Sequence, residues 1–486
     1  MDTSSGVGRP SGIELAGLDV IPESERKGRA AGLFWPWFAA NVSVLAISYG
    51  SFVLGFGLSF WQALIVSVVG IVFSFALCGL IAIAGKRGSA PTMVLSRAAF
   101  GVRGNKLPSL FSWMLTVGWE TVLVSLAALA TATVFAELGW GGGTVTQATA
   151  LVVVVALVVA AGVLGFDTIM RLQTVITVVG GVLTVVYVAL VLPELEWSAV
   201  SSLPPGPTQA VIGAVVFMMT GFGLGWVNAA ADYSRYLPRH TPGTSVAGWT
   251  TFGSAVAPVV LVFFGLLLAG SSPGLNEAIA LDPIGALTTL LPTWFLVPFA
   301  VVVVLGLVGG AVLDIYSSGL ALLAVGVPTP RWVAALIDGV IMTLGTVWVV
   351  FFATDFLGPF QGFLITLGVP IAAWCGIVLA DIGLRRRDYA DAELFDHTAR
   401  YGDVDGVSVL TLVAATLIGW GLVVNTFASW LSWQGYLLGP LGLGGRDGAW
   451  AFANLGVLVA LGLGFVVTLL ARWARVRRQE SAHGAA

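Results

Sequence analysis

Apolar runs of about 20 residues recur along the whole chain, and short polar stretches separate them. A helix needs roughly 20 apolar residues to cross the hydrocarbon core of a bilayer. The pattern therefore predicts a polytopic membrane protein without a soluble domain. We expect twelve transmembrane helices, near residues 34–56, 61–84, 108–137, 146–164, 169–192, 209–230, 245–270, 294–323, 332–353, 357–380, 408–429 and 450–471.

Composition supports the same class. Of the 486 residues 57% are hydrophobic and only 10% are charged, and the mean hydropathy is +0.96, whereas a soluble domain carries about 25% charged residues. The 62 glycines and 18 tryptophans suit a membrane bundle, in which glycine lets helices approach closely and tryptophan sits at the interfaces. We therefore expect an all-α protein whose surroundings are membrane lipid.

The basic residues predict the orientation. If both termini lie on the same side of the membrane, 21 of the 22 Lys and Arg residues lie on that side too. Arg446 is the exception. Loops rich in Lys and Arg stay in the cytoplasm. The sequence thus predicts a multi-pass protein of the plasma (cytoplasmic) membrane with both termini cytoplasmic.

Several other function classes find no support in the sequence. Cys78 and Cys375 are far apart in apolar runs, and the three histidines lie in polar stretches, so neither a disulfide nor a metal site is indicated. The one Gly-x-Ser-x-Gly match, at residues 270–274, follows a predicted transmembrane span and not a strand, so it indicates no nucleophile elbow. No span carries the repeated polar stripe of a channel. We expect no enzymatic activity, no cofactor or metal, and no nucleic-acid partner.

Two spans are interrupted by glycine and polar residues. The sixth predicted span carries Gly221, Gly223 and Gly225 at alternate positions, and each glycine weakens a helix by roughly 1 kcal/mol relative to alanine. The first span, within residues 34–63, contains several polar residues and glycines. Close helix packing alone would explain either one. As matching members of two five-helix halves, however, they indicate a transporter site at the interface of inverted repeats.

Six segments, in the same order along the chain, resemble one transporter family. They are NVSVLAISYGSFVLGFGLSFWQA, PTMVLSRAAFGVRGNKLPSL, VGWETVLV, AADYSRYLP, LDIYSSGL and VPIAAWCGIVLAD. The chain resembles the nucleobase–cation symport family, which includes purine, cytosine, allantoin and hydantoin permeases. This resemblance implies a 5+5 inverted repeat of the leucine-transporter type, with helices 11 and 12 peripheral, and cation-coupled import of a small planar heterocycle.

The resemblance also divides the chain and suggests a binding site. The expected parts are 1–33 (cytoplasmic segment), 34–192 (first repeat), 193–380 (second repeat), 381–407 (charged cytoplasmic loop), 408–471 (helices 11 and 12) and 472–486 (tail). Trp119 matches the family's stacking tryptophan, and Phe222 is a candidate second ring with Trp226 as its rival. Other candidate binding residues are Ser48, Gly50, Glu120, Gly221, Gly223, Gly310, Asp314 and Gln361.

The sequence departs from the family pattern at two places. Leu123 stands where members often have an amide, and residues 308–313 lack the usual asparagine. Polar contacts to the substrate should therefore be fewer, or come from Glu120, Asp314 or Gln361. A hydantoin, allantoin or pyrimidine vitamin precursor is the alternative substrate, and a non-transporting receptor on the same fold is the alternative function.

The coupling ion follows from the same region. Sodium-coupled members of this fold are expected to offer hydroxyls on helix eight, yet residues 305–313 contain no Ser or Thr; Ser317 and Ser318 come later. A proton needs only a buried carboxylate, and Glu120 and Asp314 lie within spans, where acidic residues are usually functional. We expect proton coupling through one of them, with a role in holding helices together as the alternative.

The remaining charged residues have expected structural roles. Asp232 and Arg235 are three apart and suited to an ion pair in a scaffold or inner gate. Asp338 should have a structural partner, and the arginines at 385–387 should anchor helix ten. The link at 91–103 predicts a short interfacial helix, with Met93, Leu95 and Phe100 facing lipid and Arg97 and Arg103 facing headgroups.

Overall fold

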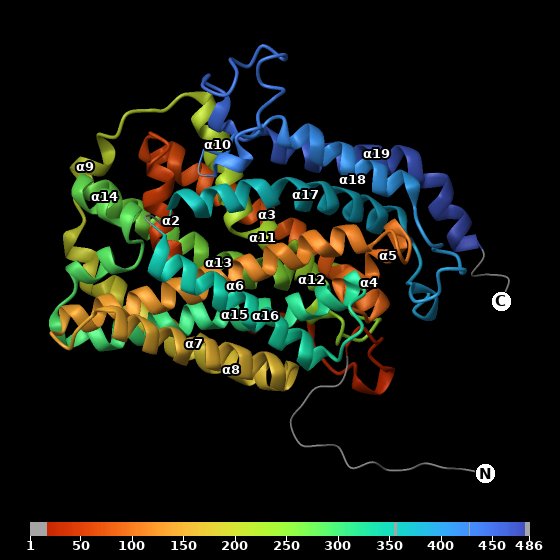
Figure 1. Cartoon of the computed structure of the whole chain (residues 1–486), viewed down its shortest axis with the longest axis horizontal. Coiled ribbons are helices and arrows are strands. Elements are labelled where there is room, and N and C mark those ends of the chain that lie inside the picture. Colours follow the sequence, from red (N-terminus) through yellow and green to blue (C-terminus); the bar gives the residue numbers. More distant parts are fainter. Residues whose placement is uncertain (1–16, 354–356, 427, 482–486) are drawn as a thin grey trace, which may run out of the picture.

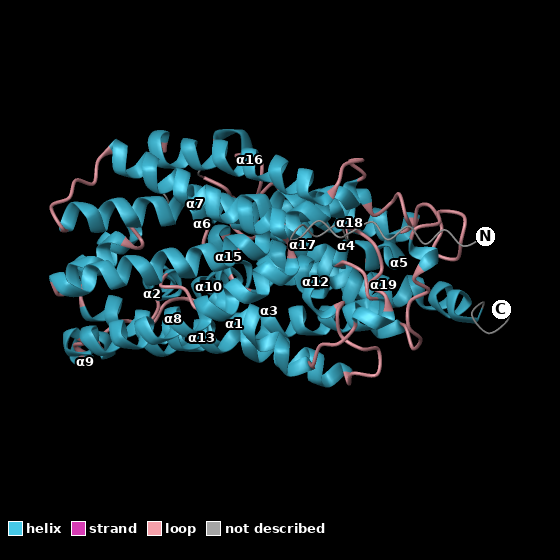
Figure 2. Cartoon of the chain, turned by 90° about the horizontal axis from the view of Figure 1, so that it is seen from below, coloured by secondary structure: helices cyan, strands magenta, loops and turns pink. Residues whose placement is uncertain are grey.

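The computed structural model describes residues 17–353, 357–426 and 428–481, which form a bundle of helices and connections (Figures 1 and 2). Residues 1–16 and 482–486, the ends of the two predicted cytoplasmic segments, lie outside the described residues. The long helices are α3 (Phe60–Gly88), α6 (Lys106–Glu137), α7 (Thr144–Leu164), α8 (Phe166–Val191), α13 (Gly243–Ser271), α15 (Leu296–Val325), α16 (Arg331–Phe352), α17 (Leu357–Leu384) and α19 (Leu455–Ser481).

Shorter helices complete the bundle. They are α1 (Phe34–Asn41), α2 (Leu45–Leu54), α4 (Thr92–Leu95), α5 (Arg97–Phe100), α9 (Trp197–Ser201), α10 (Thr208–Gly221), α11 (Gly223–Trp226), α12 (Ala230–Ser234), α14 (Pro273–Leu281) and α18 (Gly406–Trp420). The 3₁₀ turns are η1 (Glu23–Glu25), η2 (Ala30–Leu33), η3 (Leu192–Glu194), η4 (Val227–Ala229), η5 (Gly285–Leu290), η6 (Thr293–Phe295), η7 (Ala392–Leu394), η8 (Ser429–Leu431) and η9 (Ala451–Ala453).

The helix lengths support a polytopic membrane protein. Within the described ranges, ten helical stretches are long and apolar enough to cross a membrane, and the bent pair of α1 and α2 counts as an eleventh. The predicted span near 408–429 is shorter than expected, because α18 has 15 residues and ends at Trp420. The last predicted span is displaced, because α19 begins at Leu455 and continues to Ser481.

Both predicted interruptions are present. α1 and α2 meet at 65°, where Val42 leaves the helical region with φ −81° and ψ 69°. Asn41 closes the end of α1 by donating from Nδ2 to the carbonyl of Trp37 over 2.8 Å. The sixth span breaks at Phe222 (φ −122°, ψ −108°), which separates α10 from α11. Broken helices inside a bundle place free backbone groups at the membrane midplane.

Close glycine contacts bring the broken helices against their neighbours. A Cβ on Gly50 of α2 would lie 2.4 Å from the backbone of Gly265 in α13, so both positions require glycine for the two helices to touch. α13 also packs along α3, and α15 packs along α6; α1 contacts α15, and α11 contacts α3. The breaks are therefore enclosed by α3, α6, α13 and α15.

The link at 91–103 is not the interfacial helix that the sequence predicts. It forms two short helices, α4 and α5, and Met93, Leu95 and Phe100 are buried in the protein. Arg97 is also buried and donates to the carbonyl of Leu394 over 3.1 Å. Burial lowers the pKa of Arg97 to about 10. The charged connection after α17 covers this link, so its apolar residues face protein instead of lipid.

A buried ionic cluster fixes the ends of α17, α18 and α19. Asp381 of α17 pairs with Arg385 at 2.6 Å and with Arg472 of α19 at 2.5 Å. Arg472 also reaches Asp405 at 3.2 Å, and Asp405 accepts from the N–H of Ser408 to cap α18. Arg385 thus anchors the end of α17, as the sequence predicts, and it does so inside the protein.

Candidate functional site

A small central pocket lies where the two broken helices meet α6 and α15. Its volume is about 50 Å³. Residues of α1 and α2, of the break at Phe222, and of both neighbouring helices line it: Ala40, Asn41, Ser43, Leu45, Ala46, Tyr49, Trp119, Leu123, Gly221, Phe222, Trp226, Gly306 and Asp314. Four of the predicted site residues, Trp119, Gly221, Phe222 and Asp314, therefore come together from three separate spans.

Aromatic rings form much of this pocket. Trp119 stands edge-on to Phe360, with ring centroids 5.4 Å apart, and its indole nitrogen has no hydrogen-bond partner among the described residues. Phe222 packs on Tyr49 at a centroid distance of 4.6 Å. Trp226, the rival ring, also lines the pocket and packs edge-on against Trp37 at 5.6 Å. The pocket thus offers flat apolar faces, and the buried N–H of Trp119 beside it has no partner among the described residues.

The two carboxylates predicted for coupling are both buried. Asp314 lines the central pocket, and Glu120, which follows Trp119 in α6, is buried and is not among the lining residues. Neither carboxylate accepts a hydrogen bond within the described part of the chain. Asp338 of α16 differs, because it accepts from Trp113 Nε1 at 2.7 Å and from Ser318 Oγ at 2.9 Å. The structural partner predicted for Asp338 is therefore present.

The predicted glycines have different surroundings. The carbonyl of Gly221 accepts from Tyr49 Oη at 3.4 Å at the pocket wall. The N–H of Gly223 donates to Ser74 Oγ of α3 at 3.1 Å, so it is not free for a substrate. A Cβ on Gly310 would lie 2.8 Å from Leu123, and Gly310 does not line the pocket.

Ser48 and Gly50 also lie outside the central pocket. The Ser48 hydroxyl donates to the carbonyl of Pro283, beyond α14. Gly50 faces α13, as described above. The structure places both residues in helix packing on the far side of α2. Asn41 and Tyr49, which sequence reasoning did not select, face the pocket in their place; the polarity of Asn41 within an apolar span was the available signal.

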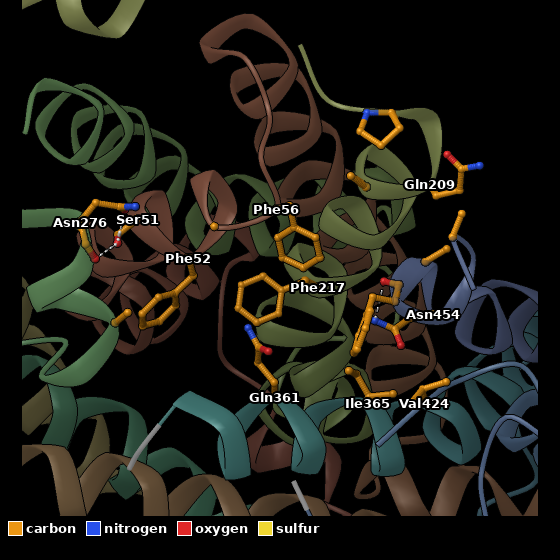
Figure 3. A pocket seen from close by; sticks show the side chains of 17 residues that line it. Ser51, Phe52, Phe56, Gln209, Phe217, Asn276, Gln361, Ile365, Val424 and Asn454 are labelled. Carbon is orange, nitrogen blue, oxygen red and sulfur yellow. Dashed lines mark hydrogen bonds between the residues drawn. The ribbon is translucent and has the colours of Figure 1, made fainter. Parts of the chain in front are cut away.

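Gln361 lines a second, much larger cavity of about 780 Å³ (Figure 3). This cavity lies between the ends of α2 and α10, α14, α17 and the connection from α18 to α19. Its lining residues are Ser51, Phe52, Gly55, Phe56, Pro207, Gln209, Ala210, Phe217, Asn276, Ala280, Gln361, Ile365, Val424, Ala449, Phe452, Ala453 and Asn454. Sequence reasoning found only Gln361 among them, because the others come from segments that are distant in the chain.

Four aromatic rings lie between the large cavity and the central pocket. Tyr49 packs on Phe217 at 5.3 Å, on Phe222 at 4.6 Å and on Phe360 at 6.2 Å. Phe217 also lines the large cavity, while Tyr49 and Phe222 line the central pocket. We call Tyr49, Phe217, Phe222 and Phe360 the aromatic layer.

Asp232 and Arg235 hold the end of the broken sixth span. Asp232 accepts from both the N–H and the hydroxyl of Thr92 at 2.7 Å. Arg235 donates to Tyr316 Oη at 2.6 Å and to Tyr236 Oη at 3.1 Å. These contacts tie α12 to α4 and α15.

An ionic cluster at the same end of the bundle joins three segments and was not anticipated. Arg239, after α12, pairs with Asp391, with Glu23 at 3.3 Å and with Asp388 at 3.7 Å. Arg26 reaches Asp391 at 3.8 Å. Burial raises the pKa of Asp391, while Arg239 and Arg26 lower it. The N-terminal segment, the end of α12 and the loop after α17 are thus held together opposite the large cavity.

Comparison with known proteins bears on this arrangement. A family described as permeases for cytosine/purines, uracil, thiamine and allantoin matches residues 20–439. The chain belongs to this permease family. The match includes both broken helices and the central pocket, and it ends before the last residues that line the large cavity.

Two members of the permease family are similar over most of their length. The Bacillus subtilis (strain 168) protein YxlA, which carries a provisional purine-cytosine permease name, is 24% identical over 451 residues, 90% of this chain and 93% of the relative. The cytosine permease of Escherichia coli K12 is 25% identical over 405 residues, 82% and 87% of the two chains. The chain is therefore a transporter of the permease type and not an enzyme.

Solved structures identify the fold. Mhp1, described as a nucleobase-cation-symport-1 family transporter in a closed conformation with bromovinylhydantoin bound, superposes with a TM-score of 0.72 at 18% identity, covering 96% of this chain and 97% of its own. A Na⁺-coupled sialic acid symporter gives a TM-score of 0.62 at 10% identity, covering 92% and 90%. The all-α fold is thus of the leucine-transporter type.

Proposed function

We propose that the protein imports a nucleobase-like planar heterocycle by cation symport, with the central pocket as its binding site. The observation that carries this proposal is the meeting of Trp119, Phe222 and Asp314 at the breaks of two helices. Flat aromatic faces suit a planar ring. A carboxylate and free backbone groups suit the donors and acceptors at its edge.

Trp119 and Asp314 have distinct roles in this proposal. The Trp119 ring stacks on the heterocycle, and its free indole N–H donates to an acceptor on the ring edge. Asp314 accepts an N–H of the substrate or carries the coupled proton. Leu123 lines the pocket where family members often have an amide, so the substrate edge has fewer polar contacts. Adenine, cytosine and uracil are the first candidates, and hydantoins follow.

A contact between α8 and α15 supports protons as the coupling ion. Gln173 of α8 donates from Nε2 to the carbonyl of Gly309 at 2.7 Å, on the stretch of α15 that faces the α1–α2 break. Sodium prefers a shell of oxygen ligands, and here one of the available oxygens already has an N–H partner. Glu120 and Asp314, buried and without hydrogen-bond partners among the described residues, suit a proton instead.

The proposal includes the topology. Basic residues cluster at the end of the bundle that carries the N-terminal segment and the loop after α17, which favours a cytoplasmic location for that end. With α18 as a short span, the chain crosses the plasma membrane twelve times and both termini are cytoplasmic. The large cavity then opens outward, and the ionic cluster around Arg239 closes the inner side, as one state of an alternating-access cycle requires.

Ligand-induced thermal stabilisation of the purified protein tests this function. Binding to the folded state raises its apparent stability, so one member of a panel of nucleobases, hydantoins and pyrimidine vitamins should raise the melting temperature. Stacking on an aromatic ring contributes about 1–3 kcal/mol, so Trp119→Ala should weaken that binding roughly tenfold or more. Trp249→Ala, at a tryptophan 39% exposed on α13, is the matched control and should leave it unchanged. The absence of a shift with every heterocycle would contradict the proposed substrate class.

A further inference from the structure

The large cavity has features of a binding site that the central pocket does not explain. Phe56 and Phe217 lie side by side across it, with ring centroids 5.8 Å apart (Figure 3). Phe52 packs near Phe217 at 6.3 Å. Gln361 reaches the same space from α17, and Asn454 reaches it from the α18–α19 connection (Figure 3). Aromatic faces and amides therefore converge from elements far apart in the chain.

Asn454 carries a buried acceptor without a partner. The residue is only 3% exposed, and its Nδ2 donates to the carbonyl of Phe452 at 3.1 Å. Its Oδ1 has no hydrogen-bond partner among the described residues. An unpaired buried acceptor costs about 1–3 kcal/mol, and Oδ1 is enclosed by protein, so a ligand with an N–H donor gains that energy when the amide turns toward the cavity. A lipid chain brings no such donor.

The two cavities differ in what they can hold. Small-molecule sites occupy roughly 300–1,000 Å³, and the large cavity at about 780 Å³ falls in that range. The central pocket at about 50 Å³ has room for a few waters at roughly 10–15 Å³ each. In this conformation only the large cavity accepts a planar heterocycle, and the aromatic layer separates it from the central pocket.

The α18–α19 connection is fixed in place as one wall of the large cavity. Pro370 has no N–H, so it leaves the carbonyl of Thr366, one turn earlier in α17, without its helical donor. Trp420 Nε1 donates to that carbonyl at 2.8 Å. Asn425 Nδ2 and Gln434 Nε2 donate to the Thr366 hydroxyl at 3.1 and 3.4 Å. The wall is thus attached one turn from Gln361.

We propose that the large cavity is a second, outer binding site for the transported heterocycle, and that the α18–α19 connection completes it. This inference rests on the proposed function. The heterocycle lies against Phe56 and Phe217, and Gln361 pairs with one edge group. The Asn454 amide turns toward the cavity so that its Oδ1 accepts the ring N–H. It then reaches Trp119 when the aromatic layer moves. The last two spans contribute to substrate selection through this wall.

Binding stoichiometry tests the outer site. Equilibrium dialysis of radiolabelled adenine and cytosine against the purified full chain in nanodiscs should give two sites per chain for the one that binds. The double variant Asn454→Gly/Gln361→Leu should retain one site. Glycine suits the positive φ of 52° at Asn454, so the backbone is kept. Trp119→Ala should also retain one site, the outer one.

Kinetics separate a binding role from a structural one. In proteoliposomes the double variant should raise the KM for uptake about tenfold, as the loss of one to two hydrogen bonds implies, with kcat unchanged. Gln147→Leu on α7, which does not line the cavity, is the control for an amide substitution and should leave both constants unchanged.

Two results would overturn the outer site. A single site in the unmodified protein, lost in Trp119→Ala and insensitive to the double variant, would leave the proposed function intact and remove the second site. Unchanged heterocycle binding in the double variant together with altered lipid retention in native mass spectrometry would assign the cavity to lipid. No heterocycle binding to any form would contradict the proposed function itself.

Discussion

The side-chain amide of Gln173 donates to the carbonyl of Gly309 over 2.7 Å and joins α8 to α15 beside the break in the first span. Residues 305–313 of α15 carry no hydroxyl side chain. The amide therefore occupies the Gly309 carbonyl with its N–H, and its Oε1, which has no partner among the described residues, is the one oxygen that this side chain offers a sodium ion.

Uptake should accordingly be independent of sodium. We expect the initial rate of heterocycle uptake at fixed pH to change by less than about twofold when choline replaces sodium outside proteoliposomes. An inward proton gradient should stimulate the same uptake. Uptake that follows a sodium gradient at constant pH would contradict proton coupling and leave the binding site untouched.

Asp314→Asn should separate coupling from binding. Asparagine preserves the size of the side chain but cannot carry a proton, so concentrative uptake should fall at least about tenfold, while exchange of internal for external substrate persists. Glu120→Gln should have the same effect if Glu120 is the carrier. Comparison of gradient-driven uptake with counterflow in the same vesicles measures the difference.

Asp338→Asn is the matched control for these carboxylate variants. Asp338 accepts from Trp113 and Ser318, and an amide has only one acceptor atom for two donors. We expect a lower melting temperature, with gradient-driven uptake and exchange reduced in the same proportion. A selective loss of gradient-driven uptake in this variant would instead place the proton on Asp338.

Arg239→Ala should open the inner side of the protein. Arg239 joins Asp391, Glu23 and Asp388, so its loss leaves these carboxylates close together without their shared cation. A cysteine introduced by Ser317→Cys, with Cys78 and Cys375 replaced by alanine, should then react faster with a polar thiol reagent from inside. Arg386→Ala, at an exposed arginine, should not change that rate.

The inner closure should also depend on pH in the Arg239→Ala variant. Burial raises the pKa of Asp391, and Arg239 lowers it, so removing the arginine raises this pKa further. The closed form then binds a proton more readily than the open form. Labelling in the variant should slow as the pH falls and quicken as the pH rises through that pKa. A rate independent of pH would show that Asp391 does not control closure.

Trp420→Phe should destabilise the attachment of the last two spans. It removes the donor to the Thr366 carbonyl that Pro370 leaves free, and an unpaired buried acceptor costs about 1–3 kcal/mol. The melting temperature should fall. Trp430→Phe, at a tryptophan 74% exposed, should leave it unchanged, and equal melting temperatures for the two variants would contradict this role of Trp420.

Periodicity and glycine placement predicted much of the fold. Hydrophobic runs of membrane length locate the spans, and the glycine triplet marks the break at Phe222, because both signals are local in the sequence. The prediction of an interfacial helix at 91–103 was wrong, because the amphipathic pattern of this link fits a protein surface as well as a lipid surface. Only the loop that folds over Arg97 decides between them, and that contact joins residues about 300 positions apart.

The candidate site was partly predictable for the same reason. Trp119 and Asp314 follow from motifs on single helices, whereas the separation of Gln361 from the central pocket depends on the rotation of α17. Ser48 and Tyr49 are neighbours in α2, yet Ser48 faces Pro283 and Tyr49 faces the pocket. The rotation of α2 about its axis determines which of the two side chains is near the substrate. A short broken helix has too few apolar positions to predict that rotation from the sequence.

Uptake of radiolabelled nucleobases into proteoliposomes tests the central claim most directly. With an inward proton gradient and no sodium, we expect at least one of adenine, cytosine and uracil to accumulate above its external concentration, and we expect Trp119→Ala to abolish that accumulation. Saturable binding of a heterocycle without accumulation under either a proton or a sodium gradient would contradict the transport function and indicate a receptor on this fold.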